Sequence, residues 1–197
     1  MTLIKDGSTG LVAKVLEGGL LRVTPEERVV LEALKGNGWF LNPSAQARTL
    51  SKTAANETIV LMQNPPASGV TAIVHKITVS YEGSGGISSN YTLVAANTIG
   101  TIGANTPAIF RNREVGSAIT PKMTGEIWDE TAGGLTGLTN GVDVTAVTLQ
   151  QGQTALLVED IVMLPGTNIS IDGDGGAQEC SFSIEFYEIA DLAALTG

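Results

Sequence analysis

The feature that most constrains the fold is the hydrophobic period, which changes from helical to alternating after about residue 38. Residues 70–81 form the longest alternating segment, and most of its apolar side chains, including Ile73, Ile77 and Val79, occupy odd positions. Alternation of this kind is typical of a strand that turns one face toward a core. The odd positions are therefore expected to face the interior.

Many further short strands are expected, separated by turn residues. The candidates are residues 57–63, 90–95, 108–111, 124–129, 142–149, 155–158, 160–164, 168–171 and 178–189. Asn-Gly, Gly-Gly and Pro-Gly pairs lie between several of them, and such pairs favour tight turns. This pattern predicts a mainly β fold, an antiparallel β-sandwich of jelly-roll type. Helices and strands do not alternate here, so a doubly wound α/β fold is not expected.

One short helix is expected before the strands, over residues 24–36. Thr24 is suited to cap its start, Pro25 to occupy its first position and Glu27 to complete a capping box. Gly36 is placed to end it. The predicted organisation is an extended arm over residues 1–23, the helix over 24–36, and a sandwich with a short tail over 37–197.

The arm is rich in glycine and carries two very short strand-like pieces. An extended segment exposes unpaired backbone groups, and it is stabilised when it adds to a sheet in its own fold or in a neighbouring subunit. We therefore interpret the arm as a tether between subunits. Its apolar side chains, which are expected to make the contacts, are Leu11, Val12, Val15, Leu20, Leu21 and Val23.

Composition restricts the partners. The 197 residues carry a formal net charge of −9, whereas surfaces that bind nucleic acid are usually basic. No apolar run approaches the ~18 residues of a membrane span, and no apolar segment follows the first charges as in a signal peptide. Contacts with nucleic acid or membrane are not expected.

Few residues suit catalysis or metal binding. His75, the single histidine, falls on the odd face of its strand, so a core or interface position is favoured over a catalytic one. Cys180, the single cysteine, is expected to be a small buried hydrophobe. Asp172 and Asp174 have calcium-loop spacing, but the other ligands of an EF-hand are missing and a glycine-rich hairpin loop is favoured. No catalytic, cofactor or metal residue is predicted, and no cofactor is expected.

Carboxylates and aromatic residues leave two alternatives open. Paired carboxylates could serve a glycosidase, although carboxylates on strands usually mark the solvated face. Aromatic rings could form a carbohydrate platform, although core positions are favoured for them. The candidates are Glu126, Asp129, Glu130, Glu185 and Glu188 for the first, and Trp39, Phe40 and Trp128 for the second.

Three parts of the chain resemble a group of structural proteins from tailed-bacteriophage particles. The first is a glycine-rich start followed by Ala-Lys-Val, and the last is a Leu-Pro-Gly turn followed by a Phe-Tyr-Glu strand. The stretches are residues 6–15 with 20–23, residues 97–102 with 111–117, and residues 162–169 with 183–188. The resemblance implies a non-enzymatic virion protein with a jelly-roll-like domain, often on the exterior of the head.

Three functions follow as hypotheses. The first is a capsid decoration or cement subunit that binds the major capsid protein or other virion proteins, as a homotrimer or another closed oligomer. The second is a neck, tail or fibre-adaptor protein of the particle. The third, from a different class, is a carbohydrate- or receptor-binding β-sandwich.

Overall fold

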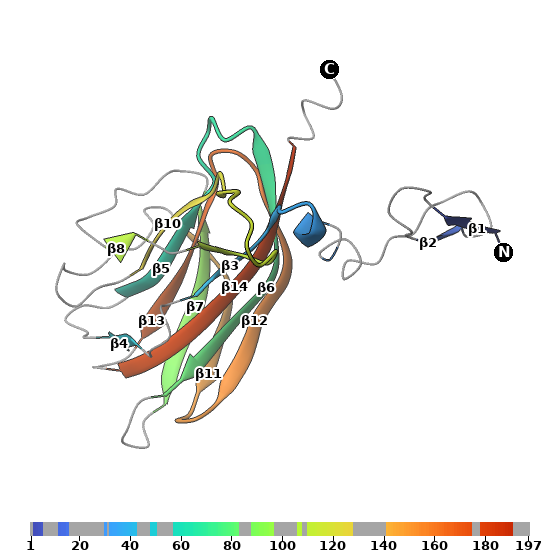
Figure 1. The fold of residues 1–197 in the computed structure, drawn as a ribbon. Coiled ribbons are helices and arrows are strands. Elements are labelled where there is room, and N and C mark those ends of the chain that lie inside the picture. The colour runs from blue at the N-terminus through green and yellow to red at the C-terminus, as the bar shows by residue number, and fades with distance from the viewer. Residues whose placement is uncertain are drawn as a thin grey trace.

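The computed structural model describes residues 2–5, 12–15, 30, 32–42, 48–50, 57–82, 88–96, 106–107, 110–127, 141–174 and 178–190. Within them no helix has the length and hydropathy that a membrane span needs. The described residues form fourteen strands (Figure 1). They are β1 Thr2–Lys5, β2 Val12–Val15, β3 Gly38–Leu41, β4 Arg48–Leu50, β5 Glu57–Gln63, β6 Val70–Tyr81, β7 Ser89–Ala96, β8 Thr106–Pro107, β9 Phe110–Asn112, β10 Thr124–Ile127, β11 Val142–Leu149, β12 Thr154–Met163, β13 Asn168–Asp174 and β14 Gln178–Ala190.

Two antiparallel sheets make up the sandwich. One has the order β12-β6-β14-β3-β9, with β4 also paired to β14, and we call it the β14 sheet. The other has the order β11-β7-β13-β5-β10-β8, and we call it the β13 sheet. β5 pairs with β13, β6 with β12 and β7 with β11, so three antiparallel pairs are nested along the chain. Nested pairs that alternate between two sheets define a jelly roll, and the predicted fold class is confirmed.

The core lies between the two sheets. The β14 sheet contributes Ile77, Val79, Ile184 and Phe186, which are all nearly or fully buried. The β13 sheet contributes a matching set, which includes Val60, Met62, Tyr91, Leu93, Ile169 and Ile171. Each such side chain stabilises the fold by about 1.5–3 kcal/mol when it is fully removed from water.

Most predicted strands are present, and three were predicted with their observed bounds, at Glu57–Gln63, Val70–Tyr81 and Val142–Leu149. The prediction of separate strands at 155–158 and 160–164 is wrong, because β12 runs through both. Its pairing to β6 shifts between Leu156 and Val158, so the strand continues through an irregularity. Two of the shortest strands, β4 and β8, have three and two residues and were not predicted.

The predicted helix is described only near its end. Residues 30 and 32–34 are helical, and the start, with Thr24, Pro25 and Glu27, lies outside the described residues. Gly36 has a φ of +74°, and its N–H donates to the Ala33 carbonyl at 3.0 Å. The left-handed conformation suits glycine and ends a helix in the predicted way. Glu32 then accepts hydrogen bonds from Lys35 at 3.0 Å and from the Asn37 side chain at 3.2 Å.

The two strand-like pieces of the arm pair with each other. β1 and β2 form an antiparallel hairpin in which Thr2 lies opposite Val15 and Lys5 lies opposite Val12. Each piece thus supplies one edge for the other, and addition of the arm to a further sheet stays a prediction. The hairpin still has two outer edges, and Figure 1 draws it apart from the sandwich. Of the expected contact residues, Val12 and Val15 lie on β2, and Leu11, Leu20, Leu21 and Val23 lie outside the described residues.

Candidate protein-binding surface

His75 lies at a bulge in β6 and not in the core. β14 pairs Glu185 with Lys76 and Phe186 with Val74, so His75 is an extra residue on β6. A bulge reverses which positions face inward, because strand side chains alternate with a period of two. Of the two predicted positions for His75, the core is therefore wrong, because its side chain is 21% exposed on the outer face, and the interface stays a prediction.

The same bulge divides β6 into two halves of opposite phase. Before it, the even residues Ala72 and Val74 are fully buried, and after it the odd residues Ile77, Val79 and Tyr81 are buried. The expectation that odd positions face the core holds for the second half only. The first half differs because the inserted residue shifts the alternation.

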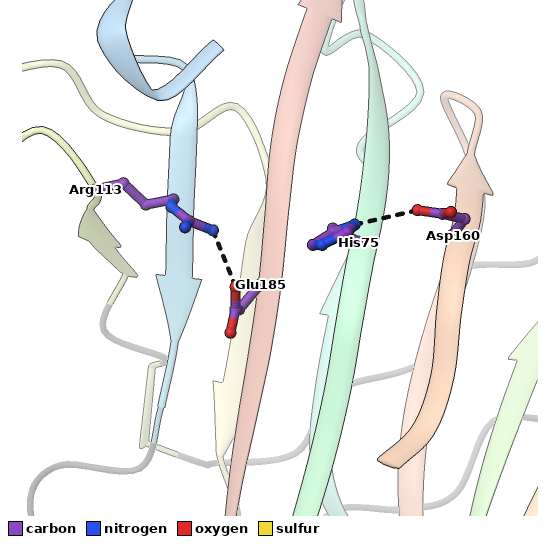
Figure 2. A network of polar contacts seen from close by, with 4 residues as sticks. All are labelled: His75, Arg113, Asp160 and Glu185. Carbon is purple, nitrogen blue, oxygen red and sulfur yellow. Dashed lines mark hydrogen bonds and ion pairs between the residues drawn. The ribbon is translucent and has the colours of Figure 1, made fainter. Parts of the chain in front are cut away.

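Asp160 faces His75 from the neighbouring strand. Its Oδ1 lies 3.2 Å from His75 Nδ1, and its side chain is 50% exposed (Figure 2). Asp160 also has a φ of +57°, which is uncommon for a residue other than glycine. The pair thus links β6 to β12 at the position where both strands depart from regular geometry.

Arg113 forms a second polar pair on the same sheet. Its guanidinium donates to Glu185 Oε2 at 2.9 Å and lies 4.7 Å from the centre of the Phe40 ring. Its backbone N–H also donates to Gly38 at 2.9 Å. Both side chains of the ion pair are about three-quarters buried. A cation over an aromatic face is stabilised by the ring quadrupole, so Arg113 is held in place from two directions.

Strand register places these groups in one row across the outer face of the β14 sheet. Arg111 of β9 lies opposite Phe40 of β3, Phe40 opposite Glu185 of β14, and Glu185 opposite Lys76 of β6. Directly paired residues point to the same side of a sheet. The register continues the row from Lys76 to Glu159 of β12, and the His75–Asp160 pair lies beside this end. The row therefore runs from Arg111 at the β9 edge to acidic residues at the β12 edge, and Figure 2 shows Glu185, His75 and Asp160 on successive strands.

Small hydroxyl side chains occupy the surface on one side of the row. Register aligns Thr154, Ser80 and Ser181 across β12, β6 and β14, and it aligns Thr78 with Ser183 in the next row. Ser80 and Thr154 share a hydrogen bond of 2.7 Å. On β6 and β14 the side chains of both rows are short, while Leu156 of β12, which lies opposite Thr78 and is 47% exposed, stands at the edge of the second row.

Two carboxylates serve the fold instead of the solvated surface. Glu188 is buried, against the expectation for strand carboxylates, and its Oε1 accepts the backbone N–H of Lys122 at 2.7 Å and of Met123 at 3.0 Å. Burial raises its pKa, and the two backbone hydrogen bonds oppose that shift. Through these hydrogen bonds Glu188 holds the segment before β10 against the end of β14.

Asp172 has a similar role on β13. Its Oδ1 accepts hydrogen bonds from Thr58 Oγ1 at 2.7 Å and from Ser170 Oγ at 3.0 Å. Burial raises its pKa, while the two hydroxyl donors lower it. Asp172, which was predicted to lie in a glycine-rich hairpin loop, therefore lies on strand β13. Its carboxylate binds the hydroxyl groups of Thr58 and Ser170. Within the described ranges, no group of three or more His, Cys, Asp or Glu residues is arranged to hold a metal ion.

The remaining candidates are divided between core and surface. Cys180 is buried as predicted, and burial raises the pKa of its thiol to about 12. Trp39 is buried in the core, whereas Phe40 is half-buried on the outer face beneath Arg113. Trp128, Asp129 and Glu130 lie outside the described residues, and Glu126 lies on β10.

Sequence reasoning did not predict the row on the outer face. The row depends on which strands are neighbours, because Arg111, Phe40, Glu185 and Lys76 come from four separate strands. In the sequence, Arg111 and Arg113 were noted only within residues 111–117, one of the stretches that carry the resemblance. Comparison of the chain with protein-family models, with curated proteins and with solved structures finds no match.

Proposed function

We propose that the protein is a non-enzymatic structural protein of a tailed-bacteriophage particle, and that it serves as a decoration or cement subunit on the head exterior. The observation that carries this proposal is the outer face of the β14 sheet. It combines charged groups, rows of Ser and Thr side chains, and the exposed aliphatic side chains Leu156 and Val162. Protein–protein interfaces have this mixed composition.

The mechanism would be association without chemistry. The sheet face would bury area against a neighbour, and the β1–β2 hairpin would add its free edges to a sheet of the major capsid protein or of another copy. The titratable side chains of the sandwich support a structural role, since Glu185, Glu188 and Asp172 all bind groups of their own fold. The proposal that the protein belongs to a phage particle rests on the resemblance of three sequence stretches to phage structural proteins.

The arm is tested by deletion of residues 1–23. We expect the truncated chain to keep the circular dichroism spectrum of the sandwich and to lose binding to particles or self-association. Unchanged occupancy on particles would show that the arm has no such role.

Location is tested by cryo-electron microscopy of purified particles of the phage that encodes the protein. Hundreds of copies over the shell would support a decoration subunit, whereas about six to twelve copies in a ring would place it at the neck or tail. Particles without the protein would contradict both assignments.

A further inference from the structure

We infer that the outer face of the β14 sheet binds a second copy of this chain through a two-fold axis that runs along β14. The inference rests on the proposed structural role, because it names the surface through which such a subunit would associate with itself. It is argued from the order of charges across the sheet, from the exposed apolar groups beside them, and from the charge of the whole chain.

The charges change sign from one edge of the sheet to the other. Arg111 is exposed on β9, which is one edge strand, and Asp160 is exposed on β12, which is the other. Glu185 lies on β14, the central strand of the five. Figure 2 shows Arg113, Glu185, His75 and Asp160 in this order across the strands.

A two-fold axis in the plane of the interface exchanges the two edges. Such an axis along β14 would place Arg111 opposite Asp160 of the partner subunit, and the same pair would form a second time. Glu185 would meet Glu185 of the partner subunit near the axis, but Arg113 of the same chain already neutralises each of them at 2.9 Å. The face is therefore complementary to itself.

The same two-fold axis also brings exposed apolar side chains of the two copies toward each other. A Cβ on Gly38 would lie 3.0 Å from Ala33 Cα, so the short helix covers the sheet on the β3 side. Leu34 of this helix is 67% exposed, and Val162 on the β12 side is 57% exposed. Val162 and Gly38 belong to one row of the sheet, which runs through Ile73 and Tyr187. The rotation therefore brings Val162 toward the helix of the partner subunit.

The charge of the chain favours this face over others for self-association. Between residues 57 and 190 the sequence has four Lys or Arg residues against fourteen Asp or Glu residues. Three of the four, Lys76, Arg111 and Arg113, lie on this face. Away from this face residues 57–190 retain a single cation, Lys122, so contacts between copies made there would bring mainly acidic side chains together, and like charges in contact oppose association.

The experiment is a charge exchange measured by sedimentation equilibrium and light scattering. We expect the full chain to be dimeric at micromolar concentration, or to form a larger closed assembly that contains this dimer. Arg111→Glu alone and Asp160→Arg alone should each raise the dissociation constant of the dimer at least tenfold. An equimolar mixture of the two variants should restore association, because each mixed pair has both contacts with opposite signs.

Controls separate this effect from net charge and from folding. Lys122→Glu and Asp143→Arg make the same charge changes at exposed positions away from the face, and they should leave the dissociation constant within about twofold. Asp160→Asn is a second variant that removes the charge with little strain, because asparagine tolerates the positive φ of this position. It should weaken association without loss of the circular dichroism spectrum. A monomeric wild-type chain, unchanged single variants, or a mixture that stays dissociated would overturn the inference. These results concern mass in solution, so they are independent of whether the protein binds phage particles.

Discussion

The side-chain amide of Asn64 donates a hydrogen bond of 2.8 Å to the backbone oxygen of Met163, across the end of the sandwich. The same Nδ2 also donates to Val70 at 2.9 Å, and the side chain is fully buried. The backbone of Asn64 bonds to Thr167 and Gly166, at 2.9 and 2.7 Å. One residue after β5 thus joins the start of β6 to the turn between β12 and β13.

Asn64→Ala should be strongly destabilising. It removes this donor from the buried carbonyl of Met163, and an unsatisfied buried group costs about 1–3 kcal/mol, whereas the part-buried carbonyl of Val70 keeps Ser68 Oγ at 3.3 Å. We expect the free energy of unfolding to fall by about 1–3 kcal/mol in urea titrations. Gln151→Ala, in an exposed turn, is the control and should change it by less than about 0.5 kcal/mol. Equal effects of the two variants would contradict this role of Asn64.

Asp172→Asn should remove a pH-dependent cost of folding. The pKa of Asp172 is raised in the folded state, so its contribution to stability is full below the ordinary value of 3.8 and declines as the pH rises through the raised pKa. Asparagine keeps an acceptor for Thr58 and Ser170 without the buried charge. We therefore expect the variant to be at least as stable as the wild type at pH 7, with an advantage that shrinks as the pH is lowered through the raised pKa and levels off once the pH is below the ordinary value of 3.8. Thermal melts between pH 3 and 7 measure this difference, and an advantage that grows at low pH would reverse the assigned sign.

Glu188→Ala and Glu188→Gln should differ. Alanine leaves the N–H groups of Lys122 and Met123 without an acceptor, at a cost of about 2–4 kcal/mol for the two together. Glutamine retains a carbonyl oxygen in the same place and should cost much less. Hydrogen exchange at residues 122 and 123 should speed up in the alanine variant and stay slow in the glutamine variant. Similar protection in both variants would show that Glu188 does not hold this segment.

Gly36→Ala and Gly152→Ala form a matched pair. Both glycines have positive φ, at +74° and +77°, and each substitution should cost about 1–2 kcal/mol for the left-handed backbone. A Cβ on Gly36 would also lie 2.5 Å from Ile119 Cδ1, whereas nothing lies within 4 Å of a Cβ on Gly152. We expect Gly36→Ala to be the more destabilising in chemical denaturation. Equal losses would mean that Ile119 moves aside without cost.

Local patterns in the sequence were sufficient to predict the strands of the sandwich. They were not sufficient to predict which side chains lie on its surface. Residues 57–63 and 142–149 were predicted with their observed bounds because turn residues flank strongly β-forming runs. The position of His75 was mispredicted because one inserted residue in β6 reverses the phase, and alternation alone cannot reveal a bulge whose cause is pairing to β14. Buried Glu188 was missed for a related reason, since its partners are backbone groups of a segment distant in sequence.

The place of β14 has a consequence for how the chain reaches this structure. β14 follows every other described strand in sequence, yet it lies at the centre of its sheet, between β3 and β6. Gly38 is paired with Tyr187, so the sheet joins early and late parts of the chain. Contacts of such long sequence separation slow folding. During synthesis β3 and β6 are made before β14, the strand that pairs with both of them. The β14 sheet can therefore form completely only after β14 has left the ribosome.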